Sequence, residues 1–422
     1  MTALTYTFYI IAAIVGFYLI FPFLTVAASL FFKGKTSENA SSSDQILVNE
    51  PKSRFLSEKG QNVQNFDFAN IITAYRNADI ARPLVESLIN QAHSAHHIYL
   101  VADNADVSNW QIQHDKLTVL KPDSALNLKV KSIIYATERF IRKHDFTIIW
   151  DADNLAHPNF LTEMNRLANT GAKAIQGQRT AKNLDNKIAA ADSLGEFYKN
   201  FIERLVPPRL GSSTVISGSG MAVEQNLYAS YLYGKDIQTG QHLWKKMMQE
   251  DKILQNHILR TNERIIYAPN AVCFDEKVTS ADAVETQRSR WLFSYFQNLP
   301  NSTGFILRGI VGCNWNKFFF GLVTAAPPLF ILVGLSGLLI ALGLFINWKI
   351  SATLIIAELI FVANIFWTLK LSDAPRSVYD SVLAMPVFVF RQFLALFKMV
   401  NPNKNFKHSE HKVAVSVDDV LK

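Results

Sequence analysis

The stretch that decides the fold is FTIIWDAD, residues 146–153. Its strand-forming part ends at Trp150, and two carboxylates, Asp151 and Asp153, follow directly. Similar apolar runs recur on both sides, and segments with helical spacing separate them. This alternation predicts an α/β layered fold with a mostly parallel sheet. In such sheets ligands bind beyond the carboxyl ends of the strands, so the polar residues just after each run form the candidate site.

The expected elements fill the middle of the chain. Strands are expected at residues 68–75, 98–102, 117–120, 146–150 and 172–177. Helices are expected at 79–91, at 126–142, from about Pro158, at 192–205 and within 244–259. No internal repeat, Walker A sequence or GxGxxG after the first strand accompanies them.

The two ends of the chain are apolar. Residues 1–32 and 318–348 contain no charged side chain, and 351–369 contains one, Glu358. A membrane-spanning helix needs about 20 apolar residues. We therefore expect an uncleaved transmembrane anchor at 1–32, a polar linker at 33–66 and a transmembrane helical hairpin at 318–370.

Basic residues set the expected topology. Lys33 and Lys35 follow the first apolar run, so the positive-inside rule places the amino terminus outside and the middle section in the cytoplasm. Arg391 lies at the centre of the last apolar stretch, which favours an interfacial amphipathic helix at 376–400 over a further span. Residues 401–422 form an expected basic cytoplasmic tail. The predicted location is the cell inner or plasma membrane, multi-pass, with the catalytic domain cytoplasmic.

Composition agrees with a membrane protein and excludes other classes. Charged residues make up 18% of the chain, against about 25% in a typical soluble protein. The 42 Lys plus Arg exceed the 35 Asp plus Glu, giving a net charge of +7. These basic residues form no stripe, so nucleic acid is not an expected partner. Cys273 and Cys313 cannot build a disulfide framework or a zinc site, which favours a reduced, cytoplasmic setting.

Acidic residues at the expected strand ends are candidates for chemistry, each with a structural alternative. Asp151 and Asp153 can hold a divalent cation that neutralises a diphosphate, or they can cap the next helix. Asp103, after strand 98–102, can accept hydrogen bonds from a nucleobase or ribose, or it can close a turn. Glu250 and Asp251 can supply a general base, or they can form a solvated helix face.

QRSRW, residues 287–291, is the most specific motif. On a helix, Gln287 shares a face with Arg290 and Trp291. Arg can grip a diphosphate with two hydrogen bonds, and Trp offers a flat face on which a sugar ring can stack. The alternative is an Arg and Trp pair at the membrane interface.

The order DxD, acidic pair, QxxRW, between an anchor and a trailing hairpin, resembles membrane-integrated family-2 glycosyltransferases. Cellulose, chitin, hyaluronan and poly-N-acetylglucosamine synthases belong to this group, and ceramide glucosyltransferases are relatives. The resemblance implies a Rossmann-like GT-A domain at 67–310 and a Mg²⁺ or Mn²⁺ cofactor.

The resemblance also implies roles for individual residues. For the nucleotide-sugar donor it implies contacts from Thr73, Ala74, Tyr75, Asp103, Lys129, Asp151, Asp153, Gln287 and Arg290, with Lys131 as a competitor for the role of Lys129. For the acceptor it implies Ser219, Gly220, Glu250 and Trp291. Asp153, with Asp151, matches the metal ligands, and Asp251 matches the general base.

The function that the resemblance implies is inverting transfer from a nucleoside-diphosphate sugar, foremost a UDP-sugar, to a growing cell-surface or extracellular polysaccharide. Membrane lipid and other subunits of a polysaccharide synthesis or export complex are the implied partners. Only three spans are expected, whereas channel-forming synthases usually have more. Two alternatives therefore stay open: transfer of one sugar to a lipid acceptor, and a non-catalytic scaffold in an export complex.

Overall fold

The computed structural model describes residues 3–31, 63–184, 186–244, 248–279, 281–384, 389–392, 396 and 415–421. Most of the expected linker, with Lys33 and Lys35, lies outside the described residues, as do parts of 376–400 and most of the basic tail. The chain divides into two compact units. The described parts of the helical unit fall within Met1–Asp44, Asp185–Ser212 and Val278–Met399, and those of the α/β unit fall within Gln45–Leu184, Ser213–Lys277 and Val400–Lys422.

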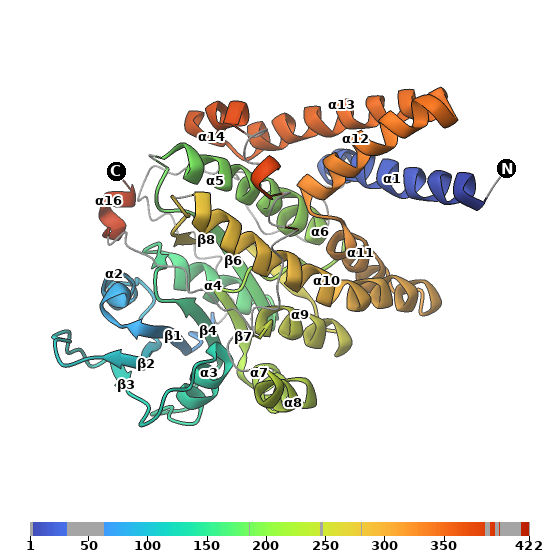
Figure 1. Ribbon diagram of the computed structural model, residues 1–422. Helices are drawn as coiled ribbons and strands as arrows, with labels where there is room; N and C mark the ends of the chain where they lie inside the picture. Colours follow the sequence, from blue (N-terminus) through green and yellow to red (C-terminus); the bar gives the residue numbers. More distant parts are fainter. Residues whose placement is uncertain are drawn as a thin grey trace. The chain divides into compact units, whose positions relative to one another are not determined.

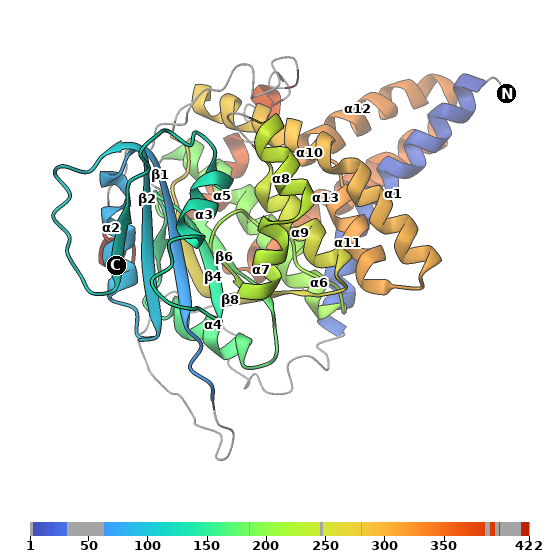
Figure 2. The ribbon, with the colours of Figure 1, turned by 90° about the horizontal axis from the view of Figure 1, so that it is seen from below.

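The α/β unit is built on one sheet with the strand order β3-β2-β1-β4-β7-β6-β8-β5 (Figures 1 and 2). The strands are β1 Phe68–Asn77, β2 His96–Asp106, β3 Leu117–Leu120, β4 Phe146–Asp151, β5 Leu155–Ala156, β6 Ala174–Ala181, β7 Met221–Glu224 and β8 Ile265–Asp275. The helices are η1 Asp79–Ala81, α2 Arg82–Ile89, α3 Lys129–Thr137, α4 Phe160–Ala168, α7 Gln225–Leu232, α8 Lys235–Leu243, α9 Glu250–Arg260 and α16 Val417–Leu421.

The sheet is mostly parallel, as the sequence predicts. β1 pairs in parallel with both β2 and β4, and β6 pairs in parallel with β8. Two short strands run against their neighbours: β7 lies between β4 and β6, and β5 pairs with β8. In the β1 register, Tyr75 lies opposite Asp103 and Thr73 lies opposite Asp151. The polar residues in the last parts of these three strands therefore meet near one edge of the sheet.

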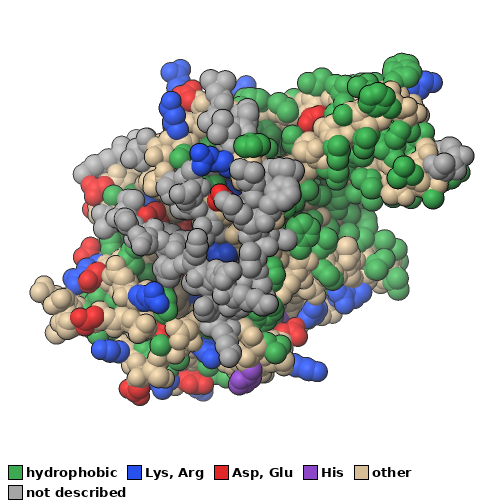
Figure 3. Space-filling view, in the orientation of Figure 1, with side chains coloured by type: hydrophobic (Ala, Val, Ile, Leu, Met, Phe, Trp, Pro, Cys, Tyr) green, Lys and Arg blue, Asp and Glu red, His purple; other side chains and the backbone are tan. Residues whose placement is uncertain are grey.

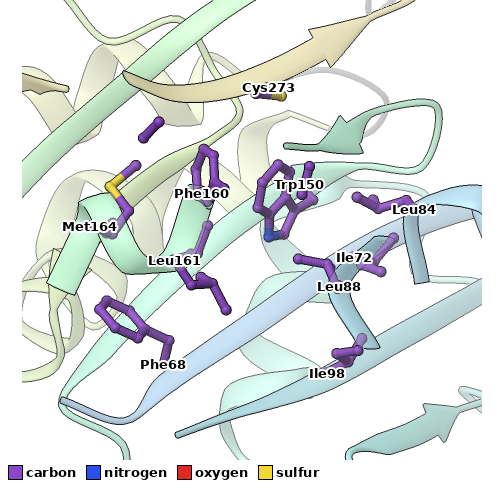
Figure 4. Close-up of a cluster of buried hydrophobic side chains, with 14 of the residues drawn as sticks. Phe68, Ile72, Leu84, Leu88, Ile98, Trp150, Phe160, Leu161, Met164 and Cys273 are labelled. Atoms are coloured by element: carbon purple, nitrogen blue, oxygen red, sulfur yellow. The ribbon is translucent and has the colours of Figure 1, made fainter. Parts of the chain in front are cut away.

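An apolar core fixes this edge in place (Figure 4). Ile72, Ile98 and Trp150 come from three adjacent strands, and Leu84 of α2 and Phe160 of α4 pack against the same sheet. All five side chains are fully buried, which accounts for the continuous apolar runs typical of strands covered on both faces. The buried Trp150 indole also donates a hydrogen bond to Asn70 Oδ1 at 3.0 Å, so its polar atom is satisfied.

The helical unit contains the apolar ends of the chain. Its helices are α1 Ala3–Phe31, α5 Lys187–Lys199, η2 Asn200–Leu205, α6 Val206–Arg209, α10 Ala281–Val311, α11 Trp315–Ala325, α12 Leu329–Ile346, α13 Trp348–Leu371, α14 Arg376–Asp380 and η3 Ser381–Ala384. Within the described residues, α1, α12 and α13 are long and apolar enough to cross a membrane. Hydrophobic side chains cover the surface of α12 and α13 (Figure 3).

Two features of the helical unit differ from the pattern in the sequence. The uncharged run 318–348 is not one helix, because Pro327 and Pro328 separate α11 from α12. The expected helix at 192–205 begins earlier, at Lys187, and its last part is the π-helix η2.

Candidate active site

The ends of β1 and β2 form the first part of the candidate site. Thr73, Ala74 and Tyr75 lie in the last part of β1, and Tyr75 Oη donates to Asn127 Oδ1 at 3.0 Å. Asp103, which is 3% exposed, accepts hydrogen bonds from the backbone N–H groups of Leu126 and Asn127 at 2.7 and 2.8 Å. Its carboxylate therefore holds the loop that precedes α3 against the end of β2.

Three residues around this loop have left-handed backbone conformations. The φ angles are 66° at Arg76, 52° at Asn104 and 58° at Asn127. Such angles are uncommon for residues other than glycine and cluster at ligand sites, where the surrounding structure maintains them. Three of the six non-glycine residues with positive φ among the described residues therefore lie around the ends of β1 and β2.

Lys129, the first residue of α3, is at the centre of the second part. Its Nζ donates to Asp151 Oδ1 at 2.6 Å and to the carbonyl oxygen of Gly218 at 3.1 Å, and it lies 3.6 Å from Glu250 Oε1. One ammonium group thus joins the end of β4, the loop before β7 and the beginning of α9. Asp251, the neighbour of Glu250, adds a third carboxylate, and Lys252 Nζ lies 3.8 Å from its Oδ2.

Burial and charge perturb this cluster. Burial opposes the charge of Lys129, but Asp151 and Glu250 outweigh it and hold the pKa of the ammonium above its usual range. Burial also raises the pKa of Glu250 to about 7; Lys129 opposes this shift and the nearby Asp251 adds to it. Carboxyl groups with a pKa near neutrality are typical of functional sites.

The loop Ser217–Met221 brings backbone close to Asp251. Gly218 has a φ of 91°, and a Cβ atom built on it would lie 3.8 Å from Asp251 Oδ2. Ser219 is fully buried, and its carbonyl oxygen accepts from Gln176 Nε2 at 3.0 Å. Gly220 is also buried, with a φ of 61°. Gly218 is therefore the member of the loop that borders the carboxylates. Ser219 and Gly220 directly precede β7, and the Gly220 N–H donates to the Ile149 carbonyl oxygen of β4.

A second layer of hydrogen bonds holds the DxD turn. The Asp151 N–H donates to Asn154 Oδ1 at 3.0 Å, and Asn154 Nδ2 donates to Asp275 Oδ1 at 3.2 Å. Lys182 Nζ donates to the carbonyl oxygen of Asp153 at 2.9 Å. These bonds tie the turn to the ends of β6 and β8.

The two carboxylates of the DxD fit a divalent cation. Asp153 is 6% exposed and Asp151 already contacts Lys129, so Asp153 is the more suitable direct ligand. Among the described residues, no group of three or more His, Cys, Asp or Glu side chains converges as a complete protein metal site. Mg²⁺ is commonly held by only one or two carboxylates together with substrate phosphates and water, and this donor set suits that mode.

Gln287, Arg290 and Trp291 lie on α10 of the helical unit. There Arg288 forms an ion pair with Asp192 of α5, and its guanidinium carbon lies 4.4 Å from the centre of the Trp291 ring. Lys199 Nζ lies 5.4 Å from the same ring. Two cations thus flank the Trp291 indole, an arrangement that fixes its orientation.

Some contacts around this site have no signal in the sequence. The resemblance includes the small-residue loop 217–221, but not the contact of its Gly218 carbonyl oxygen with Lys129. Asp275 could have been predicted from the sequence, because it ends the apolar strand β8 just as Asp151 ends β4. Asp192 and Arg288 are paired only in three dimensions, since they are far apart in the chain.

Comparisons with known proteins agree with the geometry. Residues 66–294, more than half of the chain, match the family described as "Glycosyltransferase like family 2". No curated protein matches the sequence.

Solved structures that match the chain have low sequence identity to it. The mannosyltransferase PcManGT from Pyrobaculum calidifontis, in complex with GDP-Man and Mn²⁺, matches with 14% identity and a TM-score of 0.46 over 85% of this chain and 99% of that chain. TarS from S. aureus matches with 14% identity and a TM-score of 0.37 over 53% of this chain and 38% of that chain. TarS 1-349 from S. aureus in complex with UDP-GlcNAc matches with 11% identity and a TM-score of 0.35 over 51% of this chain and 59% of that chain. The chain therefore spans less than two thirds of the length of these TarS chains.

Proposed function

The chain belongs to the family described as Glycosyltransferase like family 2, its α/β unit is GT-A-like, and from this premise we propose that it is a membrane-bound inverting glycosyltransferase. The donor is a nucleoside-diphosphate sugar, with UDP-sugars as the first class to test. The acceptor is a growing cell-surface or extracellular polysaccharide.

The observation that carries this proposal is the contact of Lys129 with Asp151, Glu250 and the Gly218 carbonyl at one edge of the sheet. A diphosphate needs cations, and the attacking hydroxyl needs a base. Both groups are present here within one cluster, because Asp251 follows Glu250 and borders Gly218.

In the reaction, Asp251 removes the proton from an acceptor hydroxyl as that oxygen attacks the anomeric carbon of the donor. The bond between this carbon and the diphosphate oxygen breaks, and the nucleoside diphosphate leaves with the bonding electrons. Attack from the face opposite the leaving group inverts the configuration. Asp251 lies in the first turn of α9, beside Gly218.

The donor is held along the sheet edge. Thr73, Ala74 and Tyr75 border the nucleobase, and Asp103 shapes this subsite by holding Asn127. Lys129 faces the diphosphate. Asp153 and Asp151 would hold the Mg²⁺ or Mn²⁺, which supplies positive charge to the leaving diphosphate when bound.

The remaining motif residues keep the roles that the family resemblance implies. Gln287 and Arg290 contact the diphosphate, and Trp291 contacts the acceptor through its ring. Ser219, Gly220 and Glu250 shape the acceptor side, with Gly218 as the point of closest approach. The three apolar helices anchor the enzyme as a multi-pass protein of the inner or plasma membrane, with the donor taken from the cytoplasm.

A second candidate function is the transfer of one sugar to a lipid acceptor. It is favoured by the small number of membrane helices, because the described residues contain only three helices that are long and apolar enough to span. A bilayer-embedded acceptor needs no polymer channel, whereas polymer export by a single chain does.

Product analysis separates these functions. The purified chain in nanodiscs is incubated with a panel of nucleotide sugars, Mn²⁺ and membrane lipids, and the products are identified by mass spectrometry. A ladder of oligosaccharides supports polymerisation, and one discrete glycolipid supports single transfer. If no donor is turned over, with or without metal, the protein is not a transferase and a scaffold role in an export complex takes its place.

A further inference from the structure

The two DxD carboxylates lie in a four-residue turn, residues 151–154, between β4 and β5. The Asn154 N–H donates to the Asp151 carbonyl oxygen at 3.1 Å, and the Asp151 N–H donates to Asn154 Oδ1 at 3.0 Å. The first of these bonds is that of a β-turn, and the second closes the turn through a side chain. The conformation of the turn therefore depends on where the Asn154 side chain is held.

Asp275, the last residue of β8, holds this side chain. Asn154 Nδ2 donates to Asp275 Oδ1 at 3.2 Å. An ionised carboxylate only accepts hydrogen bonds, so the Asn154 amide turns its NH₂ group toward Asp275 and its oxygen toward the Asp151 N–H. Asn154 is 1% exposed, which leaves water little access to replace either bond. The orientation of Asn154 is therefore set by Asp275.

Backbone pairing brings Asp275 to the turn. The strand β5, which follows the turn directly, pairs antiparallel with β8, and its Leu155 lies opposite Phe274. Asp275 is thus the next residue of β8 after the paired segment. Because backbone atoms make this pairing, a substitution of the Asp275 side chain leaves it in place. The contribution of the carboxylate can be measured separately from that of the strand.

Two cations hold the other oxygen of Asp275. Arg179 Nη2 lies 3.4 Å and Lys277 Nζ lies 3.2 Å from Asp275 Oδ2. The side chain of Lys277 is 2% exposed and that of Arg179 is 12% exposed. Arg179 Nη1 also donates to the Ser217 carbonyl oxygen at 2.9 Å. The carboxylate is therefore fixed from one side by the cations, one of which reaches the loop before β7, while Oδ1 accepts from Asn154.

We propose that Asp275 is a positioning residue of the metal site. Through Asn154 it holds the DxD turn in the conformation that presents Asp151 and Asp153 to a divalent cation. Hydrogen bonds of this kind orient metal ligands, and their loss lowers metal affinity by about 10–100-fold. The inference rests on the metal site of the proposed function and adds a residue to it.

Mn²⁺ binding tests this role without a sugar donor. The full chain is purified in nanodiscs, and its Mn²⁺ affinity is measured by electron paramagnetic resonance from the loss of the free-ion signal, with the metal alone and with UDP or GDP added. Asp275→Ala removes the bond to Asn154, whereas Asp275→Asn removes the same charge but retains an oxygen that can accept this bond. Asp236→Ala is the matched control, because it removes a carboxylate of α8 that pairs with Arg260 at 2.8 Å.

We expect Asp275→Ala and Asn154→Ala to bind Mn²⁺ about 10–100-fold more weakly than the wild type. Asp275→Asn should bind it more tightly than Asp275→Ala, and Asp236→Ala should match the wild type. Asn154→Ala removes the other end of the same bond, so it tests the inference even if Asp275→Ala does not fold.

Wild-type affinity in Asp275→Ala or in Asn154→Ala would overturn the inference. Equal losses in Asp275→Asn and Asp275→Ala would overturn it as well, because charge alone would then account for the effect. Asp153→Asn separates these results from a failure of the proposed function. If the wild type binds Mn²⁺ no better than Asp153→Asn, the DxD is not a metal site, and that part of the proposed function is lost together with the inference.

Discussion

At the scale of single residues, Glu250 controls the charge of the candidate site. It lies 3.6 Å from Lys129 and next to Asp251, and burial raises its pKa to about 7. Below that pH the protonated carboxyl leaves Asp151 and Asp251 as the negative charges around Lys129. Above it a third negative charge appears, which opposes the binding of an anionic diphosphate.

The first prediction follows from this titration. The apparent KM of the wild type for its nucleotide-sugar donor should increase as the pH rises through about 7, and Glu250→Gln should abolish the inflection. The raised pKa means that the folded state retains this proton, so the carboxyl destabilises the fold as the pH rises through the same value. Glu250→Gln should therefore unfold at a higher temperature than the wild type in alkaline buffer. An inflection that persists in the variant would assign the titration to another group.

The second prediction concerns Gly218. Its φ of 91° strains any other residue, and an added Cβ would contact Asp251 at 3.8 Å. Gly171 is the matched control, because it has a φ of 85° and an added Cβ there would meet nothing within 4 Å. Both Gly→Ala variants should lose about 1 kcal/mol of unfolding free energy. Only Gly218→Ala should also lower kcat, so equal turnover in the two variants would separate Gly218 from the chemistry.

At the scale of elements, the pairing of β6 with β8 depends on Gly177. The register shifts between Gly177 and Gln178, and an added Cβ at Gly177 would lie 2.6 Å from the Ala271 carbonyl oxygen. Backbone atoms cannot move aside as a flexible side chain can.

The third prediction is that Gly177→Ala destabilises the α/β unit by about 1–3 kcal/mol, measured by thermal unfolding in detergent. Gly195 in the middle of α5 is the control, because nothing lies within 4 Å of a Cβ added there. Gly195→Ala should be neutral or stabilising by about 0.5–1 kcal/mol through its better helix propensity. A neutral Gly177→Ala would mean that β6 and β8 pack less closely than described.

Elements with a strong pattern could be predicted from the sequence, and elements defined by their neighbours could not. The strands β1, β2 and β4 are buried on both faces and appear in the sequence as continuous apolar runs. The sequence therefore predicted that these segments are strands and in which order they occur. β7 has only four residues, Met221–Glu224, and is a strand because it fills the gap between β4 and β6. The end of the long helix at η2 follows from packing in the helical unit, where Arg204 pairs with Glu196.

The candidate site shows the same division. The expected strand ends identified Asp103 and Asp151. Asp151 is the last residue of β4, whereas β2 continues to Asp106, so Asp103 lies within its strand. The contact between Lys129 and the Gly218 carbonyl depends on a backbone conformation with φ of 91° that side-chain types do not specify. Sequence also left open whether Asp103 closes a turn or binds a base, and its hydrogen bonds to Leu126 and Asn127 give it a structural role in holding the loop.

At the scale of the whole molecule, buried histidines limit acid stability. His97 on β2 is 1% exposed, and its Nε2 lies 2.8 Å from Thr118 Oγ1. Burial, aided by the nearby Arg142 and His144, lowers the pKa of His97 to about 4. The unfolded chain therefore binds a proton that the folded chain excludes as the pH falls from about 6.5 towards about 4.

The fourth prediction is that the protein loses stability over this pH range. His97 alone should account for about 2 kcal/mol between neutral pH and pH 5. His97→Gln should show a weaker pH dependence of its unfolding temperature, with Thr118 still within reach of the new side chain. A variant with the wild-type pH dependence would assign the acid sensitivity to other groups.

The central claim is that Asp251 is the base of a glycosyl transfer, and one measurement tests it most directly. The wild type and Asp251→Asn are purified in nanodiscs, and donor binding and product formation are measured with the same nucleotide sugar. The account predicts that Asp251→Asn binds the donor with nearly wild-type affinity while its turnover falls by about 10²–10⁴-fold, as expected for loss of a general base. Wild-type turnover in Asp251→Asn would contradict the account.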